Sequence, residues 1–261
     1  MRVIGIIPAR MAATRFPNKP MALIDGMPMI GHCYFRSKMC KLLDEVYVAT
    51  CDLEIYNYIV GIGGNAVMTS DKHERATERS AEALLNVEKL VNKKFDIVVM
   101  IQGDEPLVDP EMINESVLPL INGVNQVSNL MSKLENLEEA KNPNFVKVVT
   151  DKEGKALYMS REPIPSQSKY KDVISYYRQL GLIAFTKDAI LNFITLPESS
   201  LEAIESVDMN RLLEHNIPIH MSATKYEADS VDTVEDLDRV ELKMKNDKLY
   251  LKYKNGQVNE N

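Results

Sequence analysis

The chain has few cysteines, no long apolar run and no excess of positive charge, and each absence excludes a class of protein. Its 261 residues contain only three cysteines, an odd number without metal-type spacing, which argues against a disulfide framework and a zinc site. No apolar run approaches the roughly 18 residues of a membrane-spanning helix. The formal net charge of −7 disfavours nucleic acid as a partner. We therefore expect a cytoplasmic protein that binds neither membrane nor nucleic acid.

The sequence also lacks the Gly-x-Gly-x-x-Gly motif of dinucleotide-dependent oxidoreductases. The apolar run at residues 3–7 is typical of a strand buried in a parallel sheet, but it is followed by Pro8-Ala9-Arg10. An oxidoreductase is therefore disfavoured, although the predicted sheet would suit one.

Strand-like and helix-like segments alternate through the first hundred residues, which predicts an α/β fold with a mainly parallel central sheet flanked by helices. The expected strands are residues 3–7, 45–50, 66–69 and 96–101, and the expected helices are 28–43, 53–60 and 77–92. A further strand or sheet edge is expected at 126–134 and a strand at 146–150, with a return segment starting at 156–161 and helices over 109–118 and 199–213. We assign residues 1–245 to a single domain and residues 246–261 to a polar, loosely attached tail.

A basic loop follows the first strand. Arg10, Arg15 and Lys19 occur with no acidic residue before Asp25. Because open α/β sheets bind ligands at the carboxyl ends of their strands, these cations predict a site for a phosphate chain. The alternative is a basic loop that is simply solvated.

This loop resembles a known family. Pro8-Ala9-Arg10 together with Thr14-Arg15-Phe16-Pro17-Asn18-Lys19-Pro20 is similar to the opening of the CMP-Kdo synthetases, the 3-deoxy-manno-octulosonate (Kdo) cytidylyltransferases, and the similarity extends to about Lys245. The resemblance implies a Rossmann-like nucleotidyltransferase with a small antiparallel and helical lobe, acting as a homodimer. It implies that the loop wraps the triphosphate of CTP, with contacts from Pro8, Ala9, Arg10, Arg15 and Lys19.

Two aspartates are candidate metal ligands. Asp104 lies in Gln102-Gly103-Asp104-Glu105-Pro106, directly after the strand expected at 96–101, where a carboxylate beside a triphosphate suits Mg²⁺. A plain tight turn is the alternative. The segment matches the family pattern in full, and the resemblance makes Asp104 a metal ligand and Gln102 a contact to the sugar acid. It also makes Asp232 a second Mg²⁺ ligand, although that residue could instead cap the helix that follows.

The polar segment at residues 70–79 is similar to the family's cytidine loop. It matches at His73, Thr77, Glu78 and Arg79 and departs at Arg75 and Ala76. The resemblance implies that Thr77 and Arg79 contact the nucleotide. Thr77 could equally cap the following helix.

The acceptor side of the site resembles the family less closely. Arg161 lies in a matching Ser-Arg-x-Pro-Ile-Pro segment, which implies a clamp for the substrate carboxylate, with an exposed loop arginine as the alternative. Gln179 replaces a family histidine and Ile183 a tyrosine, while Asp208 and Met209 stand where relatives have a different sequence. Asp208 is expected to share a helix face with Glu205. Apolar residues at acceptor positions predict an acid modified from Kdo, because buried hydroxyls without partners cost on the order of 1–3 kcal/mol each. The alternative is ordinary family drift.

The reaction that the resemblance implies is an in-line transfer of CMP from CTP to a small acidic sugar, with release of pyrophosphate. Lys19, Arg10 and Asp104 are the expected catalytic residues, acting by positioning and charge neutralisation with Mg²⁺. Two alternatives stay open: a different acid acceptor, such as another ulosonic acid or a phosphonate, and a nucleotide-binding homologue without catalysis.

Overall fold

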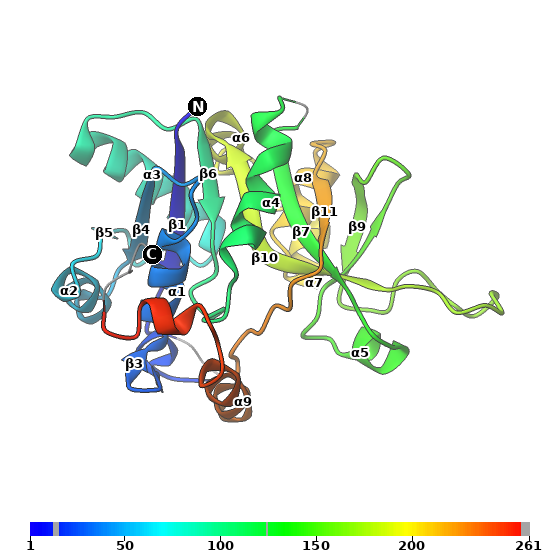
Figure 1. Ribbon diagram of the computed structural model, residues 1–261. Coiled ribbons are helices and arrows are strands. Elements are labelled where there is room, and N and C mark those ends of the chain that lie inside the picture. The colour runs from blue at the N-terminus through cyan, green and yellow to red at the C-terminus, as the bar shows by residue number, and fades with distance from the viewer. Residues whose placement is uncertain (13–15, 124, 257–261) are drawn as a thin grey trace. The chain divides into compact units, whose positions relative to one another are not determined.

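The computed structural model describes residues 1–12, 16–123 and 125–256 and contains two compact units. Unit 1 comprises Met1–Asn114 and Ala228–Asn261, and unit 2 comprises Glu115–Glu227. Figure 1 shows the elements of both units. Whether residues 1–245 act as one catalytic domain stays a prediction.

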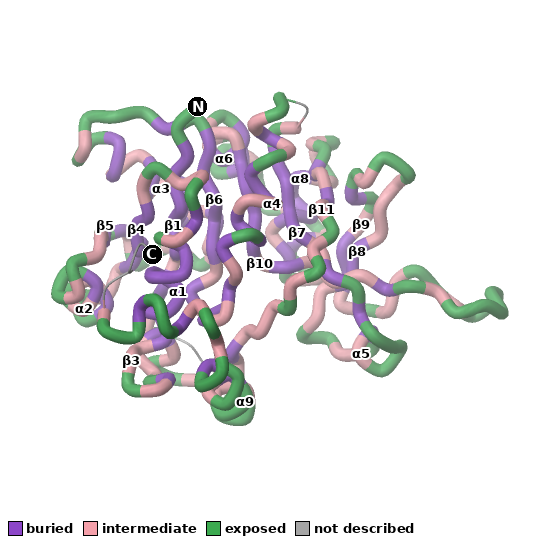
Figure 2. The backbone as a smooth tube through the Cα atoms, viewed as in Figure 1, coloured by how far each residue is buried: buried purple, intermediate pink, exposed green. Residues whose placement is uncertain are grey.

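Unit 1 is built on a parallel sheet, as the alternating pattern predicted. Its strands lie in the order β6, β1, β4, β5, with the bounds Ile97–Met100, Val3–Ala9, Glu45–Thr50 and Ala66–Met68. Strands β1 and β4 lie in the middle of this order and are buried along almost their whole length, so Figure 2 draws them mostly in purple. This explains why the sequence of β1 is an apolar run and not an alternating pattern.

Helices connect these strands, so β1, β4, β5 and β6 follow one another through crossover segments. The connecting helices are α1 (Met29–Lys38), α2 (Leu53–Gly61) and α3 (Ala76–Val91). Between β1 and α1 lie the short helix η1 and the hairpin of β2 and β3, with the bounds Lys19–Met21, Leu23–Ile24 and Met27–Pro28. After unit 2 the chain re-enters unit 1 and forms α9 (Val234–Met244) and the short helix η2 (Tyr250–Lys252).

Unit 2 is the mixed lobe that the resemblance implied. Strand β7 pairs antiparallel with β10 and parallel with β11, and β8 pairs antiparallel with both β9 and β10. The strands are Val127–Lys133, Lys147–Thr150, Ala156–Ser160, Tyr177–Thr186 and His220–Thr224, in the order β7 to β11. Its helices are α5 to α8, at Leu137–Lys141, Lys187–Phe193, Ser200–Glu205 and Met209–Glu214. Helix α4 (Pro110–Ile121) carries the chain from unit 1 into unit 2. The α/β fold class is therefore confirmed.

No helix among residues 1–12, 16–123 and 125–256 is long and apolar enough to cross a bilayer.

The single helix expected over residues 199–213 is wrong. The chain forms α7 and α8 with a break at Ser206, whose φ of 52° is left-handed. The Glu205 carboxylate accepts hydrogen bonds from Tyr158 Oη, Ser160 Oγ and the Arg161 amide, each at 2.8 Å. These contacts hold Glu205 on β9, so the helix ends there. Glu205 and Asp208 therefore do not share a helix face.

The expectation of a loosely attached tail is also wrong for residues 247–254. Tyr250 is 2% exposed and Tyr253 is 0% exposed, and the Tyr253 ring stacks on Phe35 of α1 with centroids 5.5 Å apart. In Figure 1 this segment is the red end of the ribbon. The polar composition around the two tyrosines hid their packing. Residues 257–261 lie outside the described part of the chain.

Candidate functional site

Loops from neighbouring parallel strands of unit 1 enclose a cavity of about 350 Å³. The loop after β1 contributes Pro8, Ala9 and Arg10, and the loop after β6 contributes Gln102, Gly103 and Asp104. The two strands are paired, so their carboxyl ends lie at the same edge of the sheet. A Cβ atom at Gly103 would lie 2.9 Å from the Pro8 carbonyl oxygen. Only glycine lets the two loops approach this closely.

The neighbouring strand β4 anchors the basic loop. The Met11 amide donates to Asp52 Oδ2 at 2.8 Å, and Asp52 follows β4 directly. The sequence analysis gives Asp52 no role. The available signal was its position at the end of a strand expected beside β1.

Lys19 lies between the two predicted metal ligands. Its Nζ is 2.6 Å from Asp104 Oδ2 and 3.2 Å from Asp232 Oδ1, with both carboxylates partly exposed to the cavity region (28% and 30%). The Val231 amide donates to the Asp104 carbonyl at 2.9 Å, which ties the segment before Asp232 to the loop after β6. Lys19, Asp104 and Asp232 therefore lie together, whereas their binding of a metal and a triphosphate stays a prediction.

The two carboxylates keep Lys19 charged. Burial lowers the pKa of the Lys19 ammonium, but the Coulombic attraction and hydrogen bonds of Asp104 and Asp232 outweigh it, and the pKa lies above its ordinary 10.5. The Lys19 ammonium is therefore charged at neutral pH and loses its proton only as the pH rises through this raised pKa.

The donor set fits Mg²⁺ when phosphate is present. Two carboxylate oxygens converge within hydrogen-bond distance of one nitrogen atom, and no group of three or more His, Cys, Asp or Glu side chains suitable for a metal occurs among the described residues. Magnesium usually takes one or two carboxylates and completes its shell with waters and substrate phosphates. Asp104 and Asp232 match that pattern, whereas a site made of protein ligands alone would need more donors.

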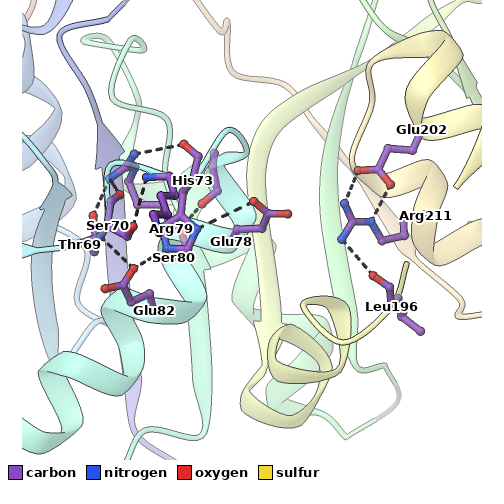
Figure 3. A network of polar contacts seen from close by, with 12 residues as sticks. Thr69, Ser70, His73, Glu78, Arg79, Ser80, Glu82, Leu196, Glu202 and Arg211 are labelled. Carbon is purple, nitrogen blue, oxygen red and sulfur yellow. Dashed lines mark hydrogen bonds and ion pairs between the residues drawn. The ribbon is translucent and has the colours of Figure 1, made fainter. Parts of the chain in front are cut away.

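A second wall of the cavity comes from the segment before α3 and the first turns of that helix. Arg79 lines the cavity although it is only 3% exposed. Its Nη1 donates to Thr69 Oγ1 at 2.6 Å and to the Ser70 carbonyl at 3.1 Å, and its Nη2 donates to the His73 carbonyl at 3.4 Å. Figure 3 shows this network. Arg79 thereby fixes the loop that carries His73.

Glu82 completes this network from the next turn of α3. Its Oε2 accepts the Ser70 amide at 3.0 Å and forms an ion pair with His73 Nε2. These contacts lower the pKa of Glu82 even though burial raises it. The first part of the predicted cytidine loop, from Ser70 to His73, is therefore held by side chains of α3.

The predicted nucleotide-contacting residues are only partly gathered in the cavity. The predicted site residues that line the cavity are Pro8, Ala9, Arg10, Lys19, Arg79, Gln102, Asp104 and Asp232. Thr77 is fully buried inside α3 and is not among the lining residues. The alternative that Thr77 caps α3 is wrong, because Arg75 occupies the cap position. Arg15 lies outside the described residues.

Of the residues predicted for the acceptor, Gln102 lies in unit 1 at the cavity, and the others lie in unit 2. The Arg161 guanidinium donates to the carbonyls of Glu205 at 2.7 Å, Pro143 at 2.8 Å and Ser206 at 3.3 Å. Gln179 is half-buried on β10, where its amide donates to the Val146 carbonyl at 2.7 Å. Asp208 precedes α8. The Arg161 side chain thus joins three backbone carbonyls, which is a structural role that the sequence did not predict.

Charged groups buried in unit 2 were also missed. Arg211 forms a two-pronged ion pair with Glu202, with both N–O distances 2.6 Å and the side chains 6% and 0% exposed. Lys147, 0% exposed, donates to the carbonyls of Asn142, Phe145 and Arg161. No periodic pattern in the sequence marks these contacts, because the turns between the partners decide which groups meet.

Comparison with known proteins agrees with this geometry. The cytidylyltransferase family model matches residues 4–222. The chain is 41% identical to the 3-deoxy-manno-octulosonate cytidylyltransferase of Thermodesulfovibrio yellowstonii, covering 92% of this chain and 97% of the relative. It is 40% identical to the protein of the same name from Fusobacterium nucleatum, covering 92% of this chain and 96% of the relative.

Solved structures give the same result. A CMP:2-keto-3-deoxy-manno-octonic acid synthetase complexed with CTP is similar with a TM-score of 0.85 and 32% identity, covering 94% of this chain and 99% of that one. The 4-diphosphocytidyl-2C-methyl-D-erythritol synthase of Anaerococcus prevotii shares the fold, with a TM-score of 0.62, 13% identity and coverage of 94% and 98%. The chain therefore belongs to the cytidylyltransferase family and, within it, to the 3-deoxy-manno-octulosonate cytidylyltransferases.

Proposed function

We propose that this chain transfers CMP from CTP to Kdo and releases pyrophosphate. The observation that carries the proposal is the placement of Lys19 against both Asp104 and Asp232 in the cavity lined by the Pro8-Ala9-Arg10 loop. Cations and carboxylates in one cavity suit a magnesium-bound triphosphate, and the relatives named above carry this activity in their names.

The chain's residues position and neutralise the reactants. Arg10 and Lys19 bind the triphosphate, Arg79 holds the loop that faces the nucleotide, and Gln102 contacts the acceptor. Asp104 and Asp232 would hold Mg²⁺, which supplies charge neutralisation at the phosphates and lowers the pKa of the attacking hydroxyl. The acceptor hydroxyl releases its proton to water and its oxygen attacks the α-phosphorus, the bond from that phosphorus to the α–β bridging oxygen breaks, and pyrophosphate leaves. This route needs no nucleophilic side chain.

A second candidate is the same transfer to an acid modified from Kdo. It is favoured by Ile183 and Met209, where polar family residues are replaced and where the side chains are 2% and 1% exposed. Both side chains are packed in the interior of unit 2. Turnover measurements, and not sequence similarity alone, therefore have to identify the acceptor.

A pyrophosphate-release assay tests both candidates. CTP, UTP, ATP and GTP are each offered with Mg²⁺ and one of a panel of acids: Kdo, amino-Kdo, another ulosonic acid and a phosphonate. The proposal predicts turnover with CTP and Kdo. A clear preference for amino-Kdo would favour the second candidate, and a clear preference for Kdo would exclude it. Nucleotide binding without turnover of any acid would contradict both and leave a non-catalytic homologue.

The metal, the oligomeric state and the cellular location implied by the resemblance are also part of this proposal. We expect Mg²⁺ to be the metal in use, a homodimer to be the working form and the cytoplasm to be the location. Turnover after metal removal and readdition of Mg²⁺ checks the first, and light scattering of the purified protein checks the second. Fractionation of cells checks the third.

A further inference from the structure

Tyr253 places a buried hydroxyl at the centre of a polar network that the reaction does not use. Its Oη is 3.0 Å from His32 Nδ1, accepts a hydrogen bond from Arg36 Nε at 3.2 Å and lies 3.8 Å from Met244 Sδ. His32 and Arg36 are 0% and 1% exposed. Arg36 is also fastened to this segment by an ion pair with Asp247 at 2.6 Å. Polar groups buried this completely need such partners to be stable.

The protonation of His32 decides which groups of this network donate and which accept. His32 Nε2 is 2.9 Å from the Ile24 carbonyl, which can only accept, so Nε2 carries the proton. Burial lowers the pKa of His32 to about 4, so the ring is neutral near pH 7 and Nδ1 is an acceptor. The Tyr253 hydroxyl therefore donates to His32 while it accepts from Arg36. Removing that hydroxyl would leave one donor and one acceptor without their partner.

Each branch of the network ends on a segment that carries a predicted site residue. His32 holds Ile24, which ends the short strand β2 that follows the η1 helix of Lys19. Arg36 Nη1 donates at 3.3 Å to the carbonyls of Leu107 and Val108, which follow Asp104 in the same loop.

The third branch reaches the segment of Asp232. Met244 is the last residue of α9, and α9 begins two residues after Asp232. The Tyr253 hydroxyl lies against the Met244 sulfur atom, and so does Arg36 Nη2, at 3.8 Å in each case. One hydroxyl thus joins the three segments on which the convergence of Lys19, Asp104 and Asp232 depends.

We propose that residues 247–254 form a strap that positions the phosphate end of the site, with Tyr253 as its positioning residue. Tyr253 is not among the described residues that line the cavity, so it acts through the three segments and not by contact with substrate. The strap lies beyond the part of the chain that the family model matches. The kinetic consequence rests on the proposed function, whereas the link between the strap and the site segments does not.

The test compares Tyr253→Phe with Tyr250→Phe. Both tyrosines are buried in the same short segment, but the Tyr250 hydroxyl donates to the Asp25 carbonyl at 3.3 Å, whereas the Tyr253 hydroxyl contacts His32, Arg36 and Met244. We expect Tyr253→Phe to speed amide exchange in residues 19–24 and 105–108 by about tenfold and to weaken binding of CTP with Mg²⁺ by about tenfold. Tyr250→Phe should stay within about twofold of the unmodified protein in both measurements. The KM for Kdo should be unchanged in both variants.

A second variant guards against simple loss of folding. Arg36→Lys keeps a cation near Asp247 but cannot reach two carbonyls and a hydroxyl together, so it should shift exchange and CTP affinity in the same direction as Tyr253→Phe. All measurements are made well below the unfolding temperature of each variant, with the fold checked by circular dichroism.

Two outcomes separate the strap from the proposed function. If both tyrosine variants lower the unfolding temperature while exchange in 19–24 and 105–108 and the affinity for CTP stay unchanged, the strap only stabilises the fold and the proposal is wrong. If exchange rises in Tyr253→Phe but neither that variant nor the unmodified protein binds CTP, the strap is supported and the proposed function fails.

Discussion

Two groups of charged side chains, one in each unit, are satisfied in opposite ways. In unit 1, Lys19, Asp104 and Asp232 meet at a cavity, and their side chains are 15%, 28% and 30% exposed. In unit 2, Glu202 and Arg211 are almost fully buried in an ion pair, and Arg161 bonds to backbone carbonyls. The first set is arranged for a ligand that brings its own charge. The second set is satisfied by the chain itself.

This difference shows that similar motif matches can have different physical uses. The segment around Asp104 resembles the family, and its carboxylate reaches the cavity. The segment around Arg161 resembles the family equally well, yet three of the five N–H donors of its guanidinium have backbone acceptors. A motif therefore identifies which residue is present, but only the local contacts show whether its side chain is available.

Replacing either carboxylate is the most direct way to break the assignment of unit 1. Asp104→Ala and Asp232→Ala should each lower turnover by about a thousandfold, because each removes one of two groups predicted to hold the metal at the triphosphate. Steady-state pyrophosphate release measures the loss, and circular dichroism checks that the fold is intact.

The matched control is Asp238→Ala, which changes an exposed aspartate of α9 in the same unit. It should keep normal turnover. Near-normal rates in Asp104→Ala or Asp232→Ala would show that the metal assignment is wrong.

The buried His32 gives a pH test of the network behind the site in unit 1. Its pKa falls from 6.5 to about 4 because burial penalises the charged ring. The unfolded chain therefore binds a proton that the folded chain does not, and folding stability is lost as the pH falls from 6.5 towards 4. The loss assigned to this group is about 3 kcal/mol.

Denaturant unfolding at several pH values measures this loss. His32→Gln should show a shallower decline over the same pH range, whereas His220→Gln in unit 2 should keep the slope of the unmodified protein. Equal slopes in all three proteins would contradict a buried neutral His32.

A substitution of Arg161 tests the part of the comparison that concerns unit 2. Arg161→Met should lower the free energy of unfolding by about 2 kcal/mol, because the carbonyls of Pro143, Glu205 and Ser206 lose their donor. The affinity for CTP should be unchanged, because the nucleotide cavity is made by unit 1. Denaturant unfolding and calorimetric titration with CTP measure the two quantities.

Lys171→Met, at an exposed position of the same unit, is the control and should change neither quantity. The carboxylate clamp implied by the resemblance predicts a different result for Arg161→Met, namely normal stability with a KM for Kdo raised about tenfold.

The sequence predicted the parts of the molecule whose physics is local. The apolar run of β1 and the helical spacing of α3 each carry their own signal, and the motifs of Lys19 and Asp104 follow strands that were predicted correctly. Because neighbouring parallel strands end at the same edge of a sheet, the proximity of the Lys19 and Asp104 motifs could also be predicted. Asp232 needed the family resemblance, since it is far from both in the chain.

The sequence failed where long-range contacts decide the structure. The break at Ser206 depends on hydrogen bonds from β9 to Glu205, and the burial of Tyr253 depends on Phe35, His32 and Arg36. Neither contact leaves a periodic pattern near the residue concerned. The polar composition of this segment therefore predicts a loose tail, although its two tyrosines are buried.

The central claim is that Lys19, Asp104 and Asp232 gather around one metal-bound triphosphate. A crystal structure of the protein with CTP and Mn²⁺ in place of Mg²⁺ tests it directly, because the anomalous signal locates the metal. We predict a metal peak coordinated by Asp104 and Asp232, with the triphosphate in contact with Arg10 and Lys19. A metal bound away from both aspartates, or a triphosphate outside the cavity, would contradict the account.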